Sequence, residues 1–458
     1  MAQKSLRKTL LSLSIAAVIG VSGTGSAFAD GDSVEALEAR IAELEALVHQ
    51  LLQKEPDCCK ETTVDSAAIE AKAAEAAEAK VTAMLAEHTG GDAEVVHKHM
   101  YKFGGYIKLD TMFSDYSSGS YNGAGREFYI PGTIPVGPNG ANGEDYLDFQ
   151  AKESRINFRS DHVLDNGAKL GTFFEMDFML SGQGDERISN SYAPRVRHAF
   201  VTYNKWLFGQ TWMTFFNVAA LPENLDFVGP AESTIFGRQA QIRYTSGNWQ
   251  IAFENPETTV TPYGGGGRIV ADDNNVPDTV LRYNLNGDWG SFAAAGMVRQ
   301  LKYEGPSGGM DINDSTTSFS LSVSGKFDFA NKDDFRWMAN WGDGIGRYIG
   351  LNTSNGAVID ENGNLSSIQQ WGAFGSYRHL WNDKWRSNFT VGYLAIDNDI
   401  SLTGTSATKN ATSYHINILY SPQPKLDFGL EYLYADRELE NGYDGSLSRF
   451  IFSAKYAF

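Results

Sequence analysis

Arginine recurs at alternating positions in segments that read as β-strands. Arg155 and Arg159 share one parity along such a segment, and so do Arg195 and Arg197. Further arginines in other strand-like segments are Arg238, Arg243, Arg282 and Arg299. The planar guanidinium group binds carboxylate or phosphate with two hydrogen bonds, and rings of Arg line anion pores. We therefore expect most of these side chains to face a polar lumen and to attract anions.

Two questions about these charges stay open in the sequence. Some arginines could pair with Glu153, Glu175 or Asp177 and only strengthen the barrel wall. Glu223, Asp226 and Glu232 could face the arginines and set up a transverse field, or they could cap turns of the loop that carries them.

The segment from Leu207 to Tyr244 is the stretch that must position these residues. It reads as strand, long loop, strand, and the loop is unusually apolar. Pro222, Gly229 and Pro230 prevent the loop from continuing as a strand. A long apolar loop must be covered or fold inward. We expect residues 214–234 to fold into the lumen of a membrane β-barrel and to narrow its pore.

The stretch 101–458 has the texture of such a barrel. Sixteen strand-like segments are joined alternately by short turns, such as 204–205 and 331–332, and by long loops. The long loops expected to be polar are 116–145, 256–277, 343–368 and 436–446. An even strand number with this alternation is typical of outer-membrane barrels and disfavours a soluble β-sandwich. The predicted fold class is an all-β, 16-stranded antiparallel transmembrane barrel with an N-terminal α-helical coiled-coil extension.

The first 29 residues read as a secretory signal peptide. Lys4, Arg7 and Lys8 precede the apolar run 10–21, and Ala27-Phe28-Ala29 forms a small-x-small cleavage site. The apolar run is too short to span a membrane as a helix. We therefore expect the chain to leave the cytoplasm and to reach the outer membrane of a Gram-negative bacterium.

Residues 30–55 carry a heptad pattern. Its a and d positions are Val34, Leu37, Ile41, Leu44, Val48 and Leu51. This spacing predicts a periplasmic coiled coil, for which we favour a trimer over two strands, although a single amphipathic helix is an alternative. Residues 56–100 follow as an Ala-rich helical linker that begins with Cys58-Cys59, two thiols that are either incidental or cross-link neighbouring subunits.

Charge and motif content exclude several function classes. The formal net charge of −18 disfavours nucleic-acid binding. No catalytic constellation, no metal-ligand spacing and no cofactor motif is evident, so we expect no enzyme activity, no cofactor and no metal site. We expect acidic side chains in the outer loops to be solvated, with binding of divalent cations or bridging of lipopolysaccharide as alternatives. Outer-membrane lipid and lipopolysaccharide would surround the barrel.

Four motifs carry a resemblance to a known family. GQTWMTF (209–215), PENLDFVGP (222–230) and GRQAQIRY (237–244) resemble the strand, inward loop and strand of the DcaP-like trimeric outer-membrane porins. PRVRHAFV (194–201) resembles the preceding strand, and the heptads before the barrel also agree. The vicinal cysteines and the Ala-rich linker depart from the family pattern.

The resemblance implies a homotrimer that takes up small anionic solutes passively, dicarboxylates in particular. It places Arg195, Arg197, Arg238 and Arg243 in the lumen, with Glu223 and Asp226 on the constriction loop, and the terminal Phe458 resembles a signal for barrel assembly. The full expected constriction set is Arg155, Arg159, Arg195, Arg197, Arg238, Gln239, Gln241, Arg243, Glu223 and Asp226. The alternative function is a structural or adhesive envelope protein tethered by its coiled-coil stalk.

Overall fold

A computed structural model describes residues 99–121, 125–138, 142–180 and 184–458. The predicted signal peptide 1–29, the predicted coiled coil 30–55, and nearly all of the linker 56–100 with its cysteines lie outside the described residues. The described part from residue 99 onward belongs to one compact unit.

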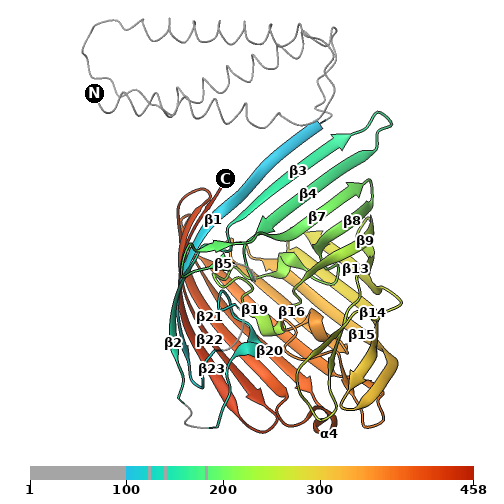
Figure 1. Cartoon of the computed structure of the whole chain (residues 1–458). Helices are drawn as coiled ribbons and strands as arrows, with labels where there is room; N and C mark the ends of the chain where they lie inside the picture. The colour runs from blue at the N-terminus through green and yellow to red at the C-terminus, as the bar shows by residue number, and fades with distance from the viewer. Residues whose placement is uncertain (1–98, 122–124, 139–141, 181–183) are drawn as a thin grey trace, which may run out of the picture. The chain divides into compact units, whose positions relative to one another are not determined.

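Long, tilted strands form the wall of that unit (Figure 1). The wall strands are β1 (His99–Tyr116), β2 (Asp145–Gln150), β3 (Arg155–Val163), β4 (Lys169–Asp177), β7 (Arg195–Tyr203), β8 (Trp206–Trp212), β9 (Arg238–Ser246), β10 (Trp249–Glu254), β13 (Asp278–Gly287), β14 (Gly290–Ser307), β15 (Met310–Asp328), β16 (Asp334–Asp343), β19 (Gln369–Leu380), β20 (Trp385–Asp397), β21 (Thr408–Gln423), β22 (Leu426–Leu439) and β23 (Asp444–Ala457). The remaining elements are β5 (Gly184–Asp185), β6 (Ser191–Tyr192), β11 (Thr258–Thr261), β12 (Ile269–Ala271), β17 (Ala357–Ile359), β18 (Leu365–Ser367), α4 (Ile400–Thr403), and the 3-10 turns η1 (Pro131–Thr133), η2 (Val218–Ala220), η3 (Ala231–Ser233) and η4 (Gly346–Tyr348).

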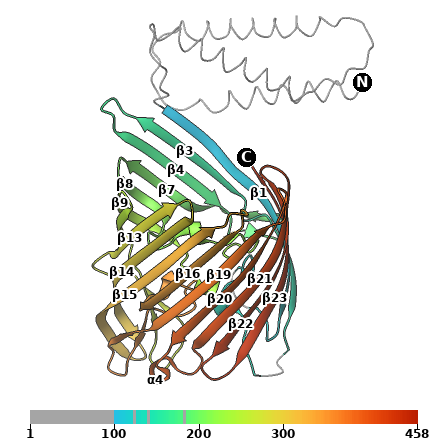
Figure 2. The same ribbon diagram turned by 180° about the vertical axis from the view of Figure 1, so that it is seen from behind.

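The wall closes into a barrel. Successive strands pair antiparallel, and β23 pairs back onto β1 in the register from Tyr106↔Ala457 to Tyr116↔Leu447 (Figure 2). Because β2 and β3 pair with successive stretches of β1, the wall has sixteen strand positions among the described residues. The predicted sixteen-stranded antiparallel barrel is therefore confirmed.

One predicted strand is broken. The segment expected as a single strand over 146–160 is divided at residues 151–154, between the pairs Asp110↔Gln150 and Tyr106↔Arg155. The four residues 151–154 lie opposite the three residues 107–109 of β1, so one extra residue is inserted, as in a β-bulge. The insertion turns Glu153 toward Lys108 of β1, with which it forms a salt bridge.

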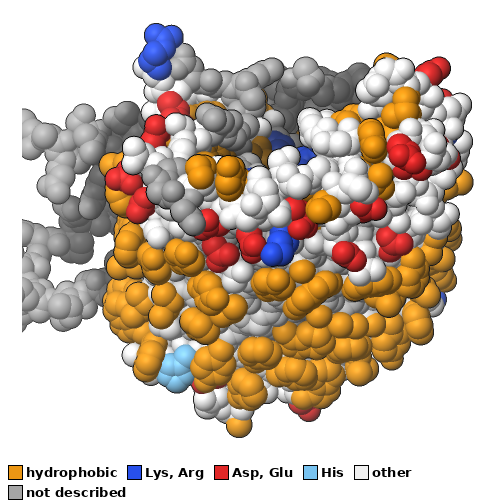
Figure 3. Space-filling view, turned by 90° about the horizontal axis from the view of Figure 1, so that it is seen from below, with side chains coloured by type: hydrophobic (Ala, Val, Ile, Leu, Met, Phe, Trp, Pro, Cys, Tyr) orange, Lys and Arg blue, Asp and Glu red, His pale blue; other side chains and the backbone are white. Residues whose placement is uncertain are grey.

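Alternation along the strands separates an apolar outside from a polar inside. On β20 the rings of Phe389 and Tyr393 are exposed on the outer wall, whereas Asn388 and Thr390 are buried inside. Hydrophobic side chains cover a continuous area of the surface that is bordered by acidic ones (Figure 3). Exposed tryptophans at the short-turn ends of the strands form an aromatic belt of the kind found at membrane interfaces. They are Trp206, Trp249, Trp289, Trp381 and Trp385.

The long connections depart from the expectation of polar loops. The connections 256–277 and 343–368 contain β11, β12, β17 and β18, which form their own four-stranded sheet in the order β12-β11-β17-β18. Val260 and Ile359 of this sheet are buried against Leu301 and Tyr303 of β14. The prediction of a long loop over 436–446 is wrong, because β22 and β23 extend into this segment and leave only residues 440–443 as a turn. The apolar side chains of these connections therefore pack in a hydrophobic core at the long-loop mouth, which is the end of the barrel where the long connections lie.

In the described ranges, no helix is both long and apolar enough to cross a membrane.

Candidate functional site

Residues 213–237, the connection between β8 and β9, lie inside the ring of strands. Phe215 and Phe216 are buried in a cluster with side chains of β13, β14, β16, β19 and β20. The apolar composition of this inward loop is explained by its packing against the inner wall, because such side chains gain free energy when removed from water.

Side chains of two neighbouring strands hold the start of the inward loop. Glu254 accepts a hydrogen bond from the backbone N of Thr214 at 2.6 Å, and Gln241 accepts one from the Thr214 hydroxyl at 2.9 Å. Gln239 donates to Glu254 at 2.6 Å. The structure thus places the predicted site residues Gln239 and Gln241 as supports of the loop backbone.

The middle of the inward loop is fastened to the opposite wall. The backbone N of Leu225 donates to Glu431 at 2.6 Å, and its carbonyl accepts from Lys108 Nζ at 3.0 Å. Asp226 accepts from the backbone N of Tyr129 at 2.8 Å and from Val228 and Gly229 within its own turn. Asp226 therefore caps a turn, the second of the two roles left open above, and its burial raises the pKa of the carboxyl.

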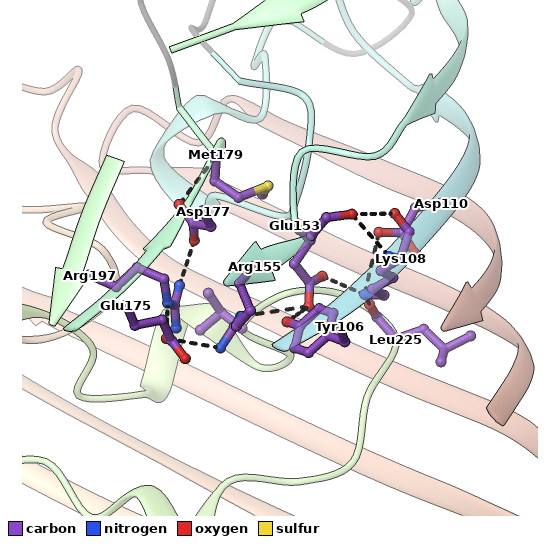
Figure 4. A network of polar contacts seen from close by, with 12 residues as sticks. Tyr106, Lys108, Asp110, Glu153, Arg155, Glu175, Asp177, Met179, Arg197 and Leu225 are labelled. Atoms are coloured by element: carbon purple, nitrogen blue, oxygen red, sulfur yellow. Dashed lines mark hydrogen bonds and ion pairs between the residues drawn. The ribbon is translucent and has the colours of Figure 1, made fainter. Parts of the chain in front are cut away.

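Beside the inward loop, arginines and carboxylates of β1, β3, β4 and β7 form one network (Figure 4). Arg197 donates to Glu175 and to Asp177, both at 2.6 Å, and Arg195 makes a two-bonded pair with Asp177 at 2.9 Å. Arg155 lies 3.5 Å from Glu175. These three arginines take the acid partners that the sequence left as an alternative. A bulge at Arg197 turns this side chain inward, so that Arg197 and its neighbour His198 are both buried.

Arg238 is the member of this group that has no acid partner at salt-bridge distance in the described part of the chain. Its guanidinium stacks on the Trp212 ring, 4.2 Å from the centroid, and its Nε and Nη2 atoms are buried without a hydrogen-bond acceptor. The guanidinium therefore carries a positive charge that no carboxylate at salt-bridge distance neutralises, on a side chain that is only partly buried. We define the arginine cluster as Arg155, Arg195, Arg197 and Arg238.

A second set of arginines supports the other side of the inward loop. Arg282 donates to the carbonyl of Phe216 at 2.5 Å, and Arg336 donates to the carbonyl of Leu221 at 2.6 Å. Glu223 pairs with Arg386 at 2.6 Å and with Arg378 at 3.6 Å. Of these arginines only Arg282 was predicted from the sequence, although Arg336, Arg378 and Arg386 also lie on the inward parities of their strands.

Three predicted site residues lie apart from the arginine cluster. Arg159 sits near the short-turn end of β3, where its side chain is 57% exposed and pairs with Asp161 at 2.7 Å. Arg243 faces the lumen near the short-turn end of β9, on the same parity as Gln241. Glu223 is occupied by Arg386 and Arg378, so neither loop acid faces the cluster as the expected field would require.

Sequence reasoning also missed Lys108. This residue is buried, pairs with Glu153 and lies 3.3 Å from Asp110. The signal was present, because Lys108 and Asp110 share one parity of a strand whose other face carries Ile107 and Leu109. Two opposite charges on one inward parity indicate a lumen network, since such groups are costly toward lipid.

Glu232 of η3 is a buried acid of the inward loop. One carboxylate oxygen accepts from the Ser413 hydroxyl at 2.8 Å, and the other has no hydrogen-bond partner among the described residues. Burial raises the pKa of this carboxyl to about 7, so it gains or loses a proton near neutral pH.

The Glu232→Gln variant should reveal this titration. A carboxyl whose pKa rises from 4.5 to about 7 on folding stabilises the barrel most below pH 4.5, and this contribution is lost as the pH rises through 7. Gln copies the protonated form, so the variant should gain stability relative to wild type between pH 5 and pH 8, by up to about 3 kcal/mol. Melting temperatures of both proteins in detergent across this range test it, and a constant difference between them would contradict it.

No three His, Cys, Asp or Glu side chains in the described ranges gather closely enough to hold a metal ion.

Comparisons with known proteins agree with this architecture. The chain matches the DcaP outer membrane protein family over residues 60–458. The crystal structure of the outer membrane channel DcaP of Acinetobacter baumannii superposes with a TM-score of 0.64 at 22% sequence identity, covering 80% of this chain and 100% of that one. The anion-selective porin from Comamonas acidovorans, at 12% identity and a TM-score of 0.45 over 79% of this chain and 100% of its own, is too distant to indicate selectivity. No curated protein matches the chain.

Proposed function

The chain belongs to the DcaP outer membrane protein family, and we propose that it is a passive channel for small anionic solutes. Membership of this family and the apolar outer wall place the barrel in the outer membrane of a Gram-negative bacterium. The observation that carries the proposal is Arg238, whose buried donors point to no acid beside the inward loop.

The charge balance around Arg238 favours anions. Arg238 and its neighbours Arg155, Arg195, Arg197 and Lys108 are five cations, and the carboxylates paired with them are four: Asp110, Glu153, Glu175 and Asp177. In a lumen walled by protein, an unmatched charge acts through a lower dielectric than water and attracts counter-ions more strongly. Solute anions would be held there by the same two-bonded geometry that Arg195 makes with Asp177.

Dicarboxylates are the solute class we favour. A dianion gains from two separated positive charges at once, and guanidinium charges stand both in the arginine cluster and at Arg282, whose hydrogen bonds go to neutral groups. A solute with one carboxylate would gain from only one of these charges. The preference for dianions is part of the proposal and is tested together with it.

We also propose a homotrimer with a periplasmic stalk. The outer faces of β1, β2, β22 and β23 carry exposed apolar side chains around a groove of about 630 Å³, including Phe113, Leu147, Leu430 and Phe450. A neighbouring barrel could cover this face, and the heptads of residues 34–51 would join the subunits on the periplasmic side.

Planar-bilayer recordings test the channel function. In a KCl gradient the purified protein should conduct in steps of three and give a reversal potential of the sign that marks chloride preference. Liposome swelling should be faster with succinate than with a neutral sugar of similar size. Bilayers that stay silent would reject the channel and favour the alternative of a tethering envelope protein.

A further inference from the structure

We propose that the long-loop mouth of the barrel carries a second anion-binding site, separate from the arginine cluster, which takes small soluble carboxylates or phosphate before they reach the inward loop. The site is a cavity of about 190 Å³. This inference rests on the proposed channel function, because it assigns a first binding step to the same solutes.

Segments far apart in the chain build this mouth pocket. It is lined by residues after β11, by the segment 353–355, by the turn that contains α4 and by the adjoining ends of β21 and β22. The loop with η1 helps to fix one lining residue, because Arg437 of β22 donates to the carbonyls of Gly132 at 2.8 Å and Ile134 at 3.1 Å. Convergence of loops from several strands places the pocket within the mouth of the barrel.

Two guanidinium groups in the pocket are held by neutral partners only. Arg268 donates from Nε to the Asn355 amide oxygen at 2.7 Å and from Nη2 to the carbonyl of Asn352. Arg437 donates from Nε to the Thr408 hydroxyl at 3.0 Å. Neither forms a salt bridge with an acid of the described ranges. Both charges are therefore fixed in place without being neutralised, which is the condition for recognising an anion.

The rest of the pocket supplies neutral hydrogen-bonding groups. Its lining consists of Thr, Ser, Asn, Gly and Ala besides the two arginines, and it contains no acid although the chain as a whole has a net charge of −18. The nearby carboxylate of Glu440, which does not line the pocket, accepts from Asn398 Nδ2 at 2.9 Å. Hydroxyl and amide donors around two cations can surround the oxygens of a carboxylate or a phosphate.

The protonation chemistry of Arg268 agrees with this assignment. Burial lowers the pKa of its guanidinium, with no carboxylate contributing in the opposite direction. A bound anion would restore the missing compensation, since an opposite charge at hydrogen-bond distance favours the charged form.

Binding measurements with Arg268→Gln test the mouth pocket. In the full-length protein purified in detergent, malonate and inorganic phosphate should bind measurably by calorimetry, and glycerol should not. The Arg268→Gln variant should bind both anions about tenfold or more weakly, because it loses charge-assisted hydrogen bonds. The Arg268→Lys variant, which keeps the charge but loses the planar fork, should fall between the two.

Lys409→Gln provides a matched control at the same mouth. Lys409 is next to Thr408 in the chain but pairs with Glu438 at 2.9 Å and does not line the pocket. The Lys409→Gln variant should bind malonate and phosphate as wild-type protein does. Equal weakening in the Lys409 and Arg268 variants, or wild-type protein that binds neither anion, would overturn the proposal.

Two further measurements separate this inference from the channel function and from lipid binding. Failure of the channel function would appear as silent bilayers for wild-type protein, whereas failure of the mouth pocket alone would appear as equal malonate affinity in wild type and Arg268→Gln while the wild-type channel still conducts. Malonate affinity should be the same in vesicles with and without lipopolysaccharide. Loss of malonate binding only when lipopolysaccharide is present would assign the site to lipid phosphate and overturn the soluble-anion assignment.

Discussion

Replacing Arg238 and Arg243 together by Gln should shift the reversal potential of the channel toward cation preference. The ratio of chloride to potassium permeability should fall several-fold. Neither Arg238 nor Arg243 forms a salt bridge in the described ranges, so their replacement breaks no ion pair. A unit charge about 4 Å from an ion is worth about 1 kcal/mol even in water, and about 1.4 kcal/mol is a tenfold change. Recordings in a KCl gradient measure the effect.

The matched control removes the same number of charges at the two ends of the barrel, away from the arginine cluster. Arg159 and Lys409 are both exposed at the two ends of the barrel and paired with Asp161 and Glu438. The Arg159→Gln, Lys409→Gln double variant should leave the reversal potential close to wild type, because exposed and paired charges are screened by salt. Equal shifts in the two double variants would reject a specific role for the arginine cluster.

The second large effect is expected from Gly392→Ala, which adds a single methyl group. Gly392 of β20 faces the inward loop, and a Cβ at this position would lie 1.9 Å from a Glu232 carboxylate oxygen and 2.8 Å from Pro230 Cβ. Gly392→Ala should therefore push the segment around η3 away from the wall. Overpacking of this kind costs about 1–3 kcal/mol. We expect a lower melting temperature and a changed single-channel conductance, since the displaced loop alters the width of the pore.

Substitutions at two other glycines are controls with smaller expected effects. A Cβ on Gly429 would lie 2.7 Å from the end of the Leu225 side chain, which can rotate away, so Gly429→Ala should have a smaller effect. A Cβ on Gly296 of β14 would meet only Leu321, at 3.8 Å, and Gly296→Ala should behave as wild type. Identical conductance and melting in all three variants would mean that the inward loop does not rest on β20 as described.

Much of the wall could be predicted from sequence because its signals are local. Alternation with a period of two tells which side chains of β20 or β23 share a face, and turn residues such as Gly247 mark where strands reverse. The same signals led to the strand number and to the inward course of a loop too apolar for water. They erred where an insertion interrupts the period, as between β2 and β3, and where loop residues build a second sheet.

The partners of the charged groups were decided only by the tertiary structure. Glu223 meets Arg386, and Leu225 meets Lys108 and Glu431, across separations of more than a hundred residues. Which side chains meet depends on the stagger between strands and on where the inward loop crosses the lumen, and neither leaves a periodic mark in the chain. The amino-acid sequence by itself therefore determined an arginine-rich barrel with an apolar inward loop. Only the folded structure decided that Arg155, Arg195 and Arg197 are paired with acids while Arg238 has no acid at salt-bridge distance among the described residues, because pairing is a property of distances between strands.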